Sequence, residues 1–258
     1  MDVHEPSEPT PQTPDAVLRY AAHDDGLVDV HLPPGPARPR PLLFYVHGGF
    51  WRQAWDRTHA RPLAEALAAS GYVVALPEYR RVGGEGHWPI TALDVEAALA
   101  ATPRMLAEAG VTTTTTTLVG HSAGGHLVLW LANQDRPVDR AVDRVVALAP
   151  VGDLRAAADW GLGDGATVAL LGGTPTEVPE AYDAADPGTR LHARPAAPVV
   201  VVHGDQDQTV PVDLSRGLVA RHGWIDYREL AGADHSDVID PLSPAWPAVL
   251  DAIGPARG

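Results

Sequence analysis

Cysteine is absent from the 258-residue sequence. This absence excludes disulfide bonds, thiol nucleophiles and zinc sites built on cysteine ligands. It leaves the cellular compartment open, because secreted proteins can also lack disulfides.

Long apolar runs are absent as well. No stretch approaches the roughly 18 apolar residues that a membrane-spanning helix needs, and the N-terminal segment MDVHEPSEPTPQTPD has no basic region followed by an apolar run. We therefore expect no signal peptide and no membrane span, which makes a cytoplasmic location the default expectation. Residues 1–15, rich in proline and glutamate, are predicted to be a disordered leader.

Positive charge is scarce. The sequence has 19 basic and 33 acidic residues, which give a formal net charge of −14. Nucleic acids and anionic membranes would be repelled by such a chain and are excluded as partners. A small-molecule substrate remains the expected partner. The sequence leaves open whether the protein assembles as a homodimer.

Apolar runs typical of buried strands alternate along the chain with segments of helical spacing. The predicted strands lie at residues 27–33, 42–46, 72–76, 117–120, 145–149, 199–202 and 225–230, and the predicted helices at residues 58–70, 90–101, 123–133 and 244–253. This alternation predicts an α/β fold with a doubly wound, mostly parallel sheet. Residues 16–258 are predicted to form one domain, in which residues 153–194 are a small cap-like insertion after the sixth strand.

A candidate nucleophile lies in the segment Gly120-His121-Ser122-Ala123-Gly124, which matches the pattern G-x-S-x-G. A predicted strand precedes the segment and a predicted helix follows it, as the nucleophile turn of a serine hydrolase requires. The alternative is a glycine-rich turn in which the serine only caps the helix. The flanking elements favour the nucleophile.

A candidate oxyanion hole follows the strand at residues 42–46. A loop of small residues lets backbone N–H groups approach the oxygen of a tetrahedral intermediate. The expected donors are the amides of Gly49, Phe50 and Ala123, with Gly48 adjacent to them.

A serine nucleophile needs a base and an acid that orients the base. Asp207 follows a buried strand and is the preferred acid, with Asp205 as the alternative. His235 follows the last predicted strand and is the expected base. The order Ser122, Asp207, His235 is that of α/β-hydrolases. No metal site is expected, since His121 and His126 have no acidic partner.

The segments HGGFW, GHSAGGHL and HGDQDQTVP together resemble the esterase and lipase branch of α/β-hydrolases, which carries an HGG-type oxyanion loop. Within this branch the chain is similar to kynurenine formamidase-like and small bacterial acetylesterase-like enzymes. The resemblance implies the α/β-hydrolase fold, an acyl-enzyme on Ser122, the acid Asp207, the base His235, and no metal or organic cofactor. Phe50 stands where such lipases often have glycine, which narrows the pocket and favours a small acyl group.

Aromatic side chains near these motifs are candidates for a substrate pocket. The residues proposed to contact substrate are Trp51, His121, Trp88 and Trp160. Arg52, Arg80 and Arg81 are weaker candidates for pairing with a substrate carboxylate. The predicted activity is hydrolysis of a small-acyl ester or an aryl formamide. A peptidase or acyltransferase on the same triad, or a non-catalytic binding protein on this fold, are the alternatives.

Overall fold

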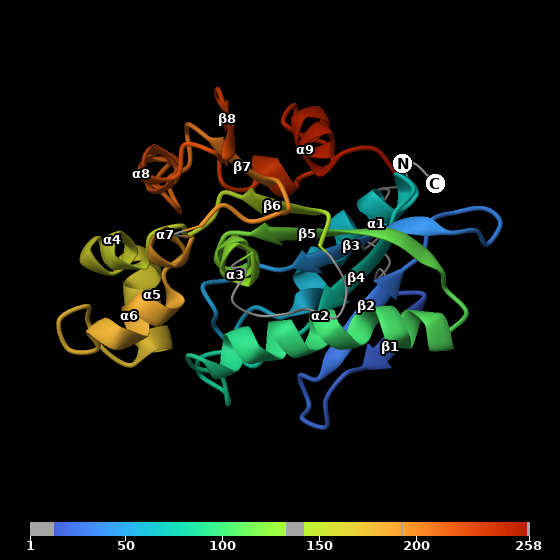
Figure 1. The fold of residues 1–258 in the computed structure, drawn as a ribbon, viewed down its shortest axis with the longest axis horizontal. Helices are drawn as coiled ribbons and strands as arrows, with labels where there is room; N and C mark the ends of the chain where they lie inside the picture. The colour runs from blue at the N-terminus through green and yellow to red at the C-terminus, as the bar shows by residue number, and fades with distance from the viewer. Residues whose placement is uncertain (1–12, 133–141, 192, 257–258) are drawn as a thin grey trace, which may run out of the picture.

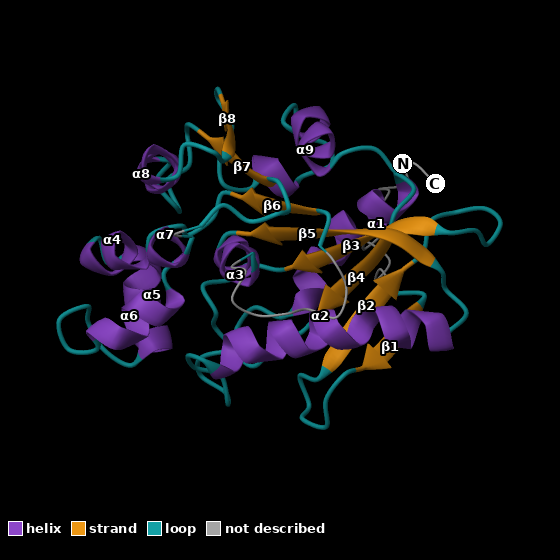
Figure 2. Cartoon of the chain, viewed as in Figure 1, coloured by secondary structure: helices purple, strands orange, loops and turns teal. Residues whose placement is uncertain are grey.

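An eight-stranded sheet forms the centre of the computed structural model, which describes residues 13–132, 142–191 and 193–256 (Figures 1 and 2). The strands are β1 (Ala16–Arg19), β2 (Leu27–His31), β3 (Arg40–Val46), β4 (Val73–Pro77), β5 (Thr113–His121), β6 (Arg144–Leu148), β7 (Val199–Gly204) and β8 (Asp226–Leu230). Their order across the sheet is β1-β2-β4-β3-β5-β6-β7-β8. β2 pairs antiparallel with β1 and β4, and all the other pairings are parallel.

Helices cover both faces of this sheet, as the predicted doubly wound architecture requires. The helices are η1 (Arg57–Ala60), α1 (Arg61–Ala69), α2 (Ile90–Glu108), α3 (Ala123–Leu131), α4 (Leu154–Asp159), α5 (Leu162–Leu171), α6 (Pro179–Ala185), α7 (Pro187–Arg190), α8 (Asp213–Arg221), η2 (Asp237–Ile239) and α9 (Trp246–Ile253). Alternate side chains of a strand point to opposite faces. In β3, Leu42 and Phe44 therefore belong to the core cluster on one face, which includes residues of α2, α3 and α8, whereas Leu43 and Tyr45 belong to the cluster on the other face, which includes residues of α1 and α9.

Helices α4 to α7 follow β6 and lie beside the ends of β5 and β6 toward which the strand arrows point (Figure 1). They fall within the segment predicted to be an insertion, residues 153–194. The leader predicted for residues 1–15 lies mostly outside the described residues. None of the described helices is long and apolar enough to cross a membrane.

Several details differ from the sequence prediction, and four are the most informative. β1 and α8 were not expected, α2 continues past the predicted end at residue 101, and β5 begins four residues earlier than residue 117. α2 passes through Pro103, and the hydroxyl of Thr102 donates to the carbonyl of Ala98 one turn earlier. The buried side chains of Met105 and Leu106 then hold the last turns against the core, which offsets the missing hydrogen bond at the proline.

Candidate active site

Ser122 occupies the turn between β5 and α3 in a strained backbone conformation, with φ 55° and ψ −117°. Its amide donates to the carbonyl of Leu148 at 2.9 Å, and its own carbonyl accepts from the amide of His126 at 3.1 Å. These bonds hold the turn from both sides. Backbone strain of this kind in a non-glycine residue persists only where the surroundings enforce it, and it concentrates at functional sites.

The two glycines of the G-x-S-x-G segment are required by close backbone approach. A Cβ atom on Gly120 would lie 2.2 Å from the carbonyl oxygen of Gly124, and one on Gly124 would lie 2.0 Å from that of Val46. Neither position can hold a larger residue without moving the backbone. The segment therefore forms the sharp strand-to-helix turn that presents a serine at the edge of the sheet.

The predicted oxyanion loop lies directly against this turn. A Cβ atom on Gly48 would lie 3.1 Å from the Cβ of Ser122. The next three residues all have positive φ, with 108° at Gly49, 51° at Phe50 and 55° at Trp51. Positive φ is uncommon for bulky side chains, so the loop, like the serine turn, is held in an unfavourable conformation by its surroundings.

The predicted acid and base are hydrogen-bonded to each other. His235 follows β8, and its Nδ1 lies 2.6 Å from Oδ2 of Asp207, which follows β7. This bond leaves Nε2 of His235 as the ring nitrogen available for proton transfer. Asp205, the alternative acid, instead accepts a hydrogen bond from the amide of Gly232 at 2.8 Å.

Asp207 is buried and fully engaged by donors. Its Oδ1 accepts from the amides of Thr209 and Val210, each at 2.8 Å, and Nε2 of His203 lies 3.0 Å from Oδ2. Burial by itself raises the pKa of Asp207, but the hydrogen bonds from His203 and His235 outweigh it and hold the pKa well below its usual range. The carboxylate therefore stays ionised and able to orient His235.

His121, which was predicted to contact substrate, packs against His235. The two rings lie 4.5 Å apart, and Nε2 of His121 lies 3.0 Å from the carbonyl oxygen of His235, to which it donates. Burial lowers the pKa of His121 well below its usual value, and the charge of His235 acts in the same direction. A neutral His121 at 6% exposure thus supports the loop that carries His235.

The tryptophans proposed to line the pocket differ in their surroundings. Trp51 is fully buried and meets the ring of His126 edge-on at 5.2 Å, and Trp88 packs against Trp130 at 5.3 Å. These contacts favour packing over substrate contact for both. Trp88 is half-buried, and Trp160, at the end of α4, is 51% exposed and is the most exposed of the three.

The three candidate arginines all contact the protein itself. Arg52 donates to the carbonyls of Gly163 and Asp164 in the cap, which joins the cap to the oxyanion loop. Arg80 forms a bidentate ion pair with Asp94, with N···O distances of 2.8 and 2.7 Å. Arg81 is 2% exposed and belongs to a buried network centred on Glu78.

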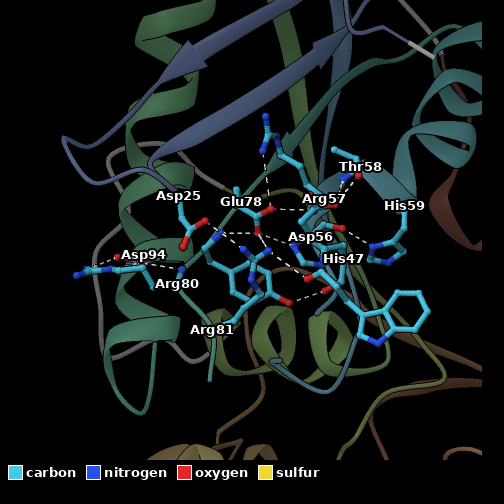
Figure 3. Close-up of polar contacts among 12 residues, drawn as sticks. Asp25, His47, Asp56, Arg57, Thr58, His59, Glu78, Arg80, Arg81 and Asp94 are labelled. Atoms are coloured by element: carbon cyan, nitrogen blue, oxygen red, sulfur yellow. Dashed lines mark hydrogen bonds and ion pairs between the residues drawn. The ribbon is translucent and has the colours of Figure 1, made fainter. Parts of the chain in front are cut away.

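A buried network of charged side chains lies behind the oxyanion loop (Figure 3). At its centre the carboxylate of Glu78 accepts from the Nε2 of His47 at 2.9 Å, from the amide of Arg57 at 2.8 Å and from the guanidinium of Arg81. Arg81 also pairs with Asp25 at 3.1 Å. His47 and Glu78 had no predicted role, although both stand at the carboxyl ends of the neighbouring parallel strands β3 and β4. Across the ranges that the structure covers, no group of three or more metal-binding side chains is arranged to hold a metal ion.

Known proteins resemble this chain over most of its length. The sequence profile of the BD-FAE family matches residues 28–221. Two curated relatives come from Mycobacterium tuberculosis. Esterase LipC is 30% identical over 230 residues, which are 80% of this chain and 55% of the relative. The protein named "Probable carboxylic ester hydrolase LipM" is 32% identical over 231 residues, which are 84% of this chain and 51% of the relative. The chain thus spans about half the length of these relatives.

Solved structures share the fold. A truncated carbohydrate esterase from gut microbiota superposes with a TM-score of 0.74 at 19% identity, covering 88% of this chain and 91% of its own. The esterase Est2 from Thermogutta terrifontis superposes with a TM-score of 0.71 at 21% identity, covering 94% and 96%. The family profile spans the oxyanion loop and the serine turn and ends after Asp207, so it covers most of the elements that build the site. The chain belongs to the BD-FAE family of α/β-hydrolase esterases.

Proposed function

We propose that this protein is a serine carboxylic ester hydrolase that uses Ser122 as nucleophile, His235 as base and Asp207 as orienting acid. The observation that carries the proposal is the 2.6 Å hydrogen bond between Asp207 and His235. His235 lies beside His121, which directly precedes the strained Ser122. The esterases among the relatives support the same chemistry.

In the proposed reaction, Oγ of Ser122 attacks the ester carbonyl while Nε2 of His235 takes the hydroxyl proton. The oxygen of the tetrahedral intermediate accepts hydrogen bonds from the backbone amides of Gly49, Phe50 and Ala123. His235 then donates its proton to the departing alkoxide, which leaves an acyl group on Ser122. Water, deprotonated by His235, hydrolyses the acyl-enzyme and restores the serine.

The proposed substrate carries a small acyl group. The Phe50 side chain packs so closely on the cap that a Cβ atom on Gly163 would lie 2.6 Å from the Phe50 ring. The cap therefore covers the loop that supplies the oxyanion donors. The hydrogen bonds of Arg52 connect this loop to the cap. A long acyl chain would have to displace this contact.

Hydrolysis of a substrate panel by wild type and Ser122→Ala tests the proposal. The panel contains p-nitrophenyl acetate, p-nitrophenyl decanoate and N-formylkynurenine, the last to test the aryl formamide reaction. We expect wild type to have its highest kcat/KM on the acetate and Ser122→Ala to be inactive. Faster turnover of N-formylkynurenine would make the formamide the proper substrate class. Equal activity of wild type and the variant would refute the role of Ser122.

A further inference from the structure

His47 and Glu78 form a second carboxylate–imidazole pair, separate from Asp207 and His235, at the base of the oxyanion loop (Figure 3). Nε2 of His47 lies 2.9 Å from Oε1 of Glu78, and Nδ1 lies 2.8 Å from the carbonyl oxygen of Gly48. A carbonyl oxygen only accepts hydrogen bonds, so Nδ1 is a donor. Nε2 is a donor as well if Glu78 is ionised, because a carboxylate also only accepts.

The surroundings of Glu78 keep it ionised although it is 1% exposed. Its two oxygens accept from the amides of Tyr79 and Arg57 and from the guanidinium of Arg81, in addition to His47. Burial raises the pKa of Glu78, but the hydrogen bonds and charges of His47 and Arg81 outweigh it and lower the pKa to about 2. With Glu78 ionised, the ring nitrogens of His47 face two acceptors, the carboxylate of Glu78 and the carbonyl oxygen of Gly48.

The hydrogen bond to Gly48 bears directly on a predicted oxyanion donor. The carbonyl of Gly48 and the N–H of Gly49 belong to one planar peptide unit, in which they point in opposite directions. Fixing the carbonyl therefore fixes the direction of the N–H. The hydrogen bond to the carbonyl also polarises the same peptide and strengthens the N–H as a donor.

Tyr79 holds His47 in this orientation. Its ring stacks on the imidazole with centroids 4.5 Å apart and planes 15° apart, and its hydroxyl donates to the carbonyl of His47 at 2.9 Å. His47 is fully buried. The imidazole therefore has little freedom to rotate away from Gly48.

We infer that Glu78 and His47 are positioning residues for the oxyanion hole. Glu78 orients His47 through its hydrogen bond to Nε2, and His47 aims the Gly49 N–H at the oxyanion through the Gly48 carbonyl. This inference rests on the proposed esterase function, because it assigns a further device to the same site. The site then contains one carboxylate–imidazole pair for the nucleophile and one for the oxyanion hole.

Two substitutions of His47 separate its two hydrogen bonds. The amide nitrogen of asparagine lies near the position of Nδ1, whereas that of glutamine lies near the position of Nε2. His47→Asn therefore keeps a donor for Gly48, and His47→Gln keeps a donor for Glu78. We expect His47→Gln to lower kcat on p-nitrophenyl acetate by about 100-fold, as loss of an oxyanion donor does, with KM nearly unchanged. His47→Asn should retain clearly more kcat than His47→Gln.

A purely structural role for His47 predicts the opposite order of kcat for His47→Asn and His47→Gln. If the ring served only to satisfy the buried Glu78, His47→Gln would be the more active and more stable variant. The inhibition constant of a short trifluoromethyl ketone adds a second readout, because the oxygen of its serine adduct occupies the oxyanion hole. We expect this constant to rise in proportion to the loss of kcat across the variants.

Two further variants keep the inference testable if those of His47 fail to fold. Glu78→Gln keeps the size of the side chain but removes its charge, and we expect kcat to fall at least about tenfold at unchanged KM. Glu108→Gln, which changes an exposed glutamate paired with Arg104, is the matched control and should behave as wild type. A wild type without esterase activity would refute the proposed function. An active wild type with unaffected Glu78→Gln, or with His47→Gln above His47→Asn, would refute only the inference.

Discussion

At the scale of single residues, Asp205 and Asp207 follow the same strand but have different partners. Asp207 holds His235 and is surrounded by donors, whereas Asp205 accepts from Gly232 and from the side chain of Gln206 on the exposed side of the loop. The hydrogen bond to Nδ1 sets which tautomer of His235 is present. This difference makes the two aspartates a matched pair for testing the site.

We predict that Asp207→Asn lowers kcat by about 10⁴-fold, the magnitude observed when a triad aspartate is changed to asparagine. The amide can donate to Nδ1 and so favours the wrong tautomer of His235. Asp205→Asn, the control, should change kcat less than about twofold. Steady-state hydrolysis of p-nitrophenyl acetate measures both, and a larger loss in Asp205→Asn would reassign the acid.

Glu78 also predicts how stability depends on pH. Its pKa of about 2 in the folded protein lies below the ordinary value of 4.5. A lowered pKa stabilises the folded state above the unfolded pKa, and this contribution is lost as pH falls from about 5 toward about 2. Urea unfolding across this range should therefore show a steeper loss of stability in wild type than in Glu78→Gln. The same dependence of the free energy of unfolding on pH in the two proteins would contradict the ionised, paired state of Glu78.

The residues that matter most for the site were partly visible in the sequence. Ser122 and His235 stand in recognisable motifs at strand ends, and the preference for Asp207 over Asp205 agrees with the hydrogen bonds. His47 and His203 also begin recognisable segments, HGGFW and HGDQDQTVP, but their roles could not be predicted, because their partners are set by how the loops fold over the strand ends. The separation of His47 and Glu78 along the sequence does not predict that their side chains form a hydrogen bond.

At the scale of elements, the oxyanion loop and the cap are in direct contact. The Phe50 ring lies against Gly163, and Arg52 crosses to the same turn. We predict that Phe50→Ala raises kcat/KM for p-nitrophenyl decanoate relative to the acetate by about tenfold, which corresponds to roughly 1.4 kcal/mol of acyl-chain binding. The measurement is the ratio of the two constants in variant and wild type. An unchanged ratio would mean that Phe50 does not limit the acyl pocket.

Helix α2 offers a test of the packing that supports the sheet. Leu106 in its last turns is fully buried, whereas Leu93 near its start is 38% exposed. Leu106→Ala should reduce the free energy of unfolding by about 2–5 kcal/mol, and Leu93→Ala by under about 1 kcal/mol. Chemical denaturation measures both changes. A small effect at Leu106 would show that the helix does not continue past Pro103 as described.

The elements missed by the sequence analysis share a physical reason. β1 is a four-residue edge strand with alternating exposed and half-buried residues, so it lacks the apolar run that marked the central strands. In α8 only Leu214, Ser215 and Leu218 are buried, and charged residues surround them. Both elements are stabilised by neighbours rather than by their own composition, whereas the buried strands β3 to β7 could be predicted directly.

At the scale of the whole molecule, the net charge of −14 repels anionic ligands. We predict that kcat/KM for an anionic ester such as 4-acetoxybenzenesulfonate rises when the salt concentration is raised from about 10 mM to about 200 mM, because salt screens the repulsion. The value for neutral p-nitrophenyl acetate should stay constant. A fall for the anionic ester would indicate a cationic binding site that outweighs the net charge.

The central claim is that Ser122 is a nucleophile activated by His235 and Asp207. Intact-protein mass spectrometry after treatment with a fluorophosphonate tests it most directly, because the reagent labels only an activated serine. We predict a single adduct in the intact mass of wild type, which peptide mapping places on the segment that contains Ser122, and no adduct on Ser122→Ala. An unlabelled wild type, or an adduct that persists in Ser122→Ala, would rule out Ser122 as the activated nucleophile.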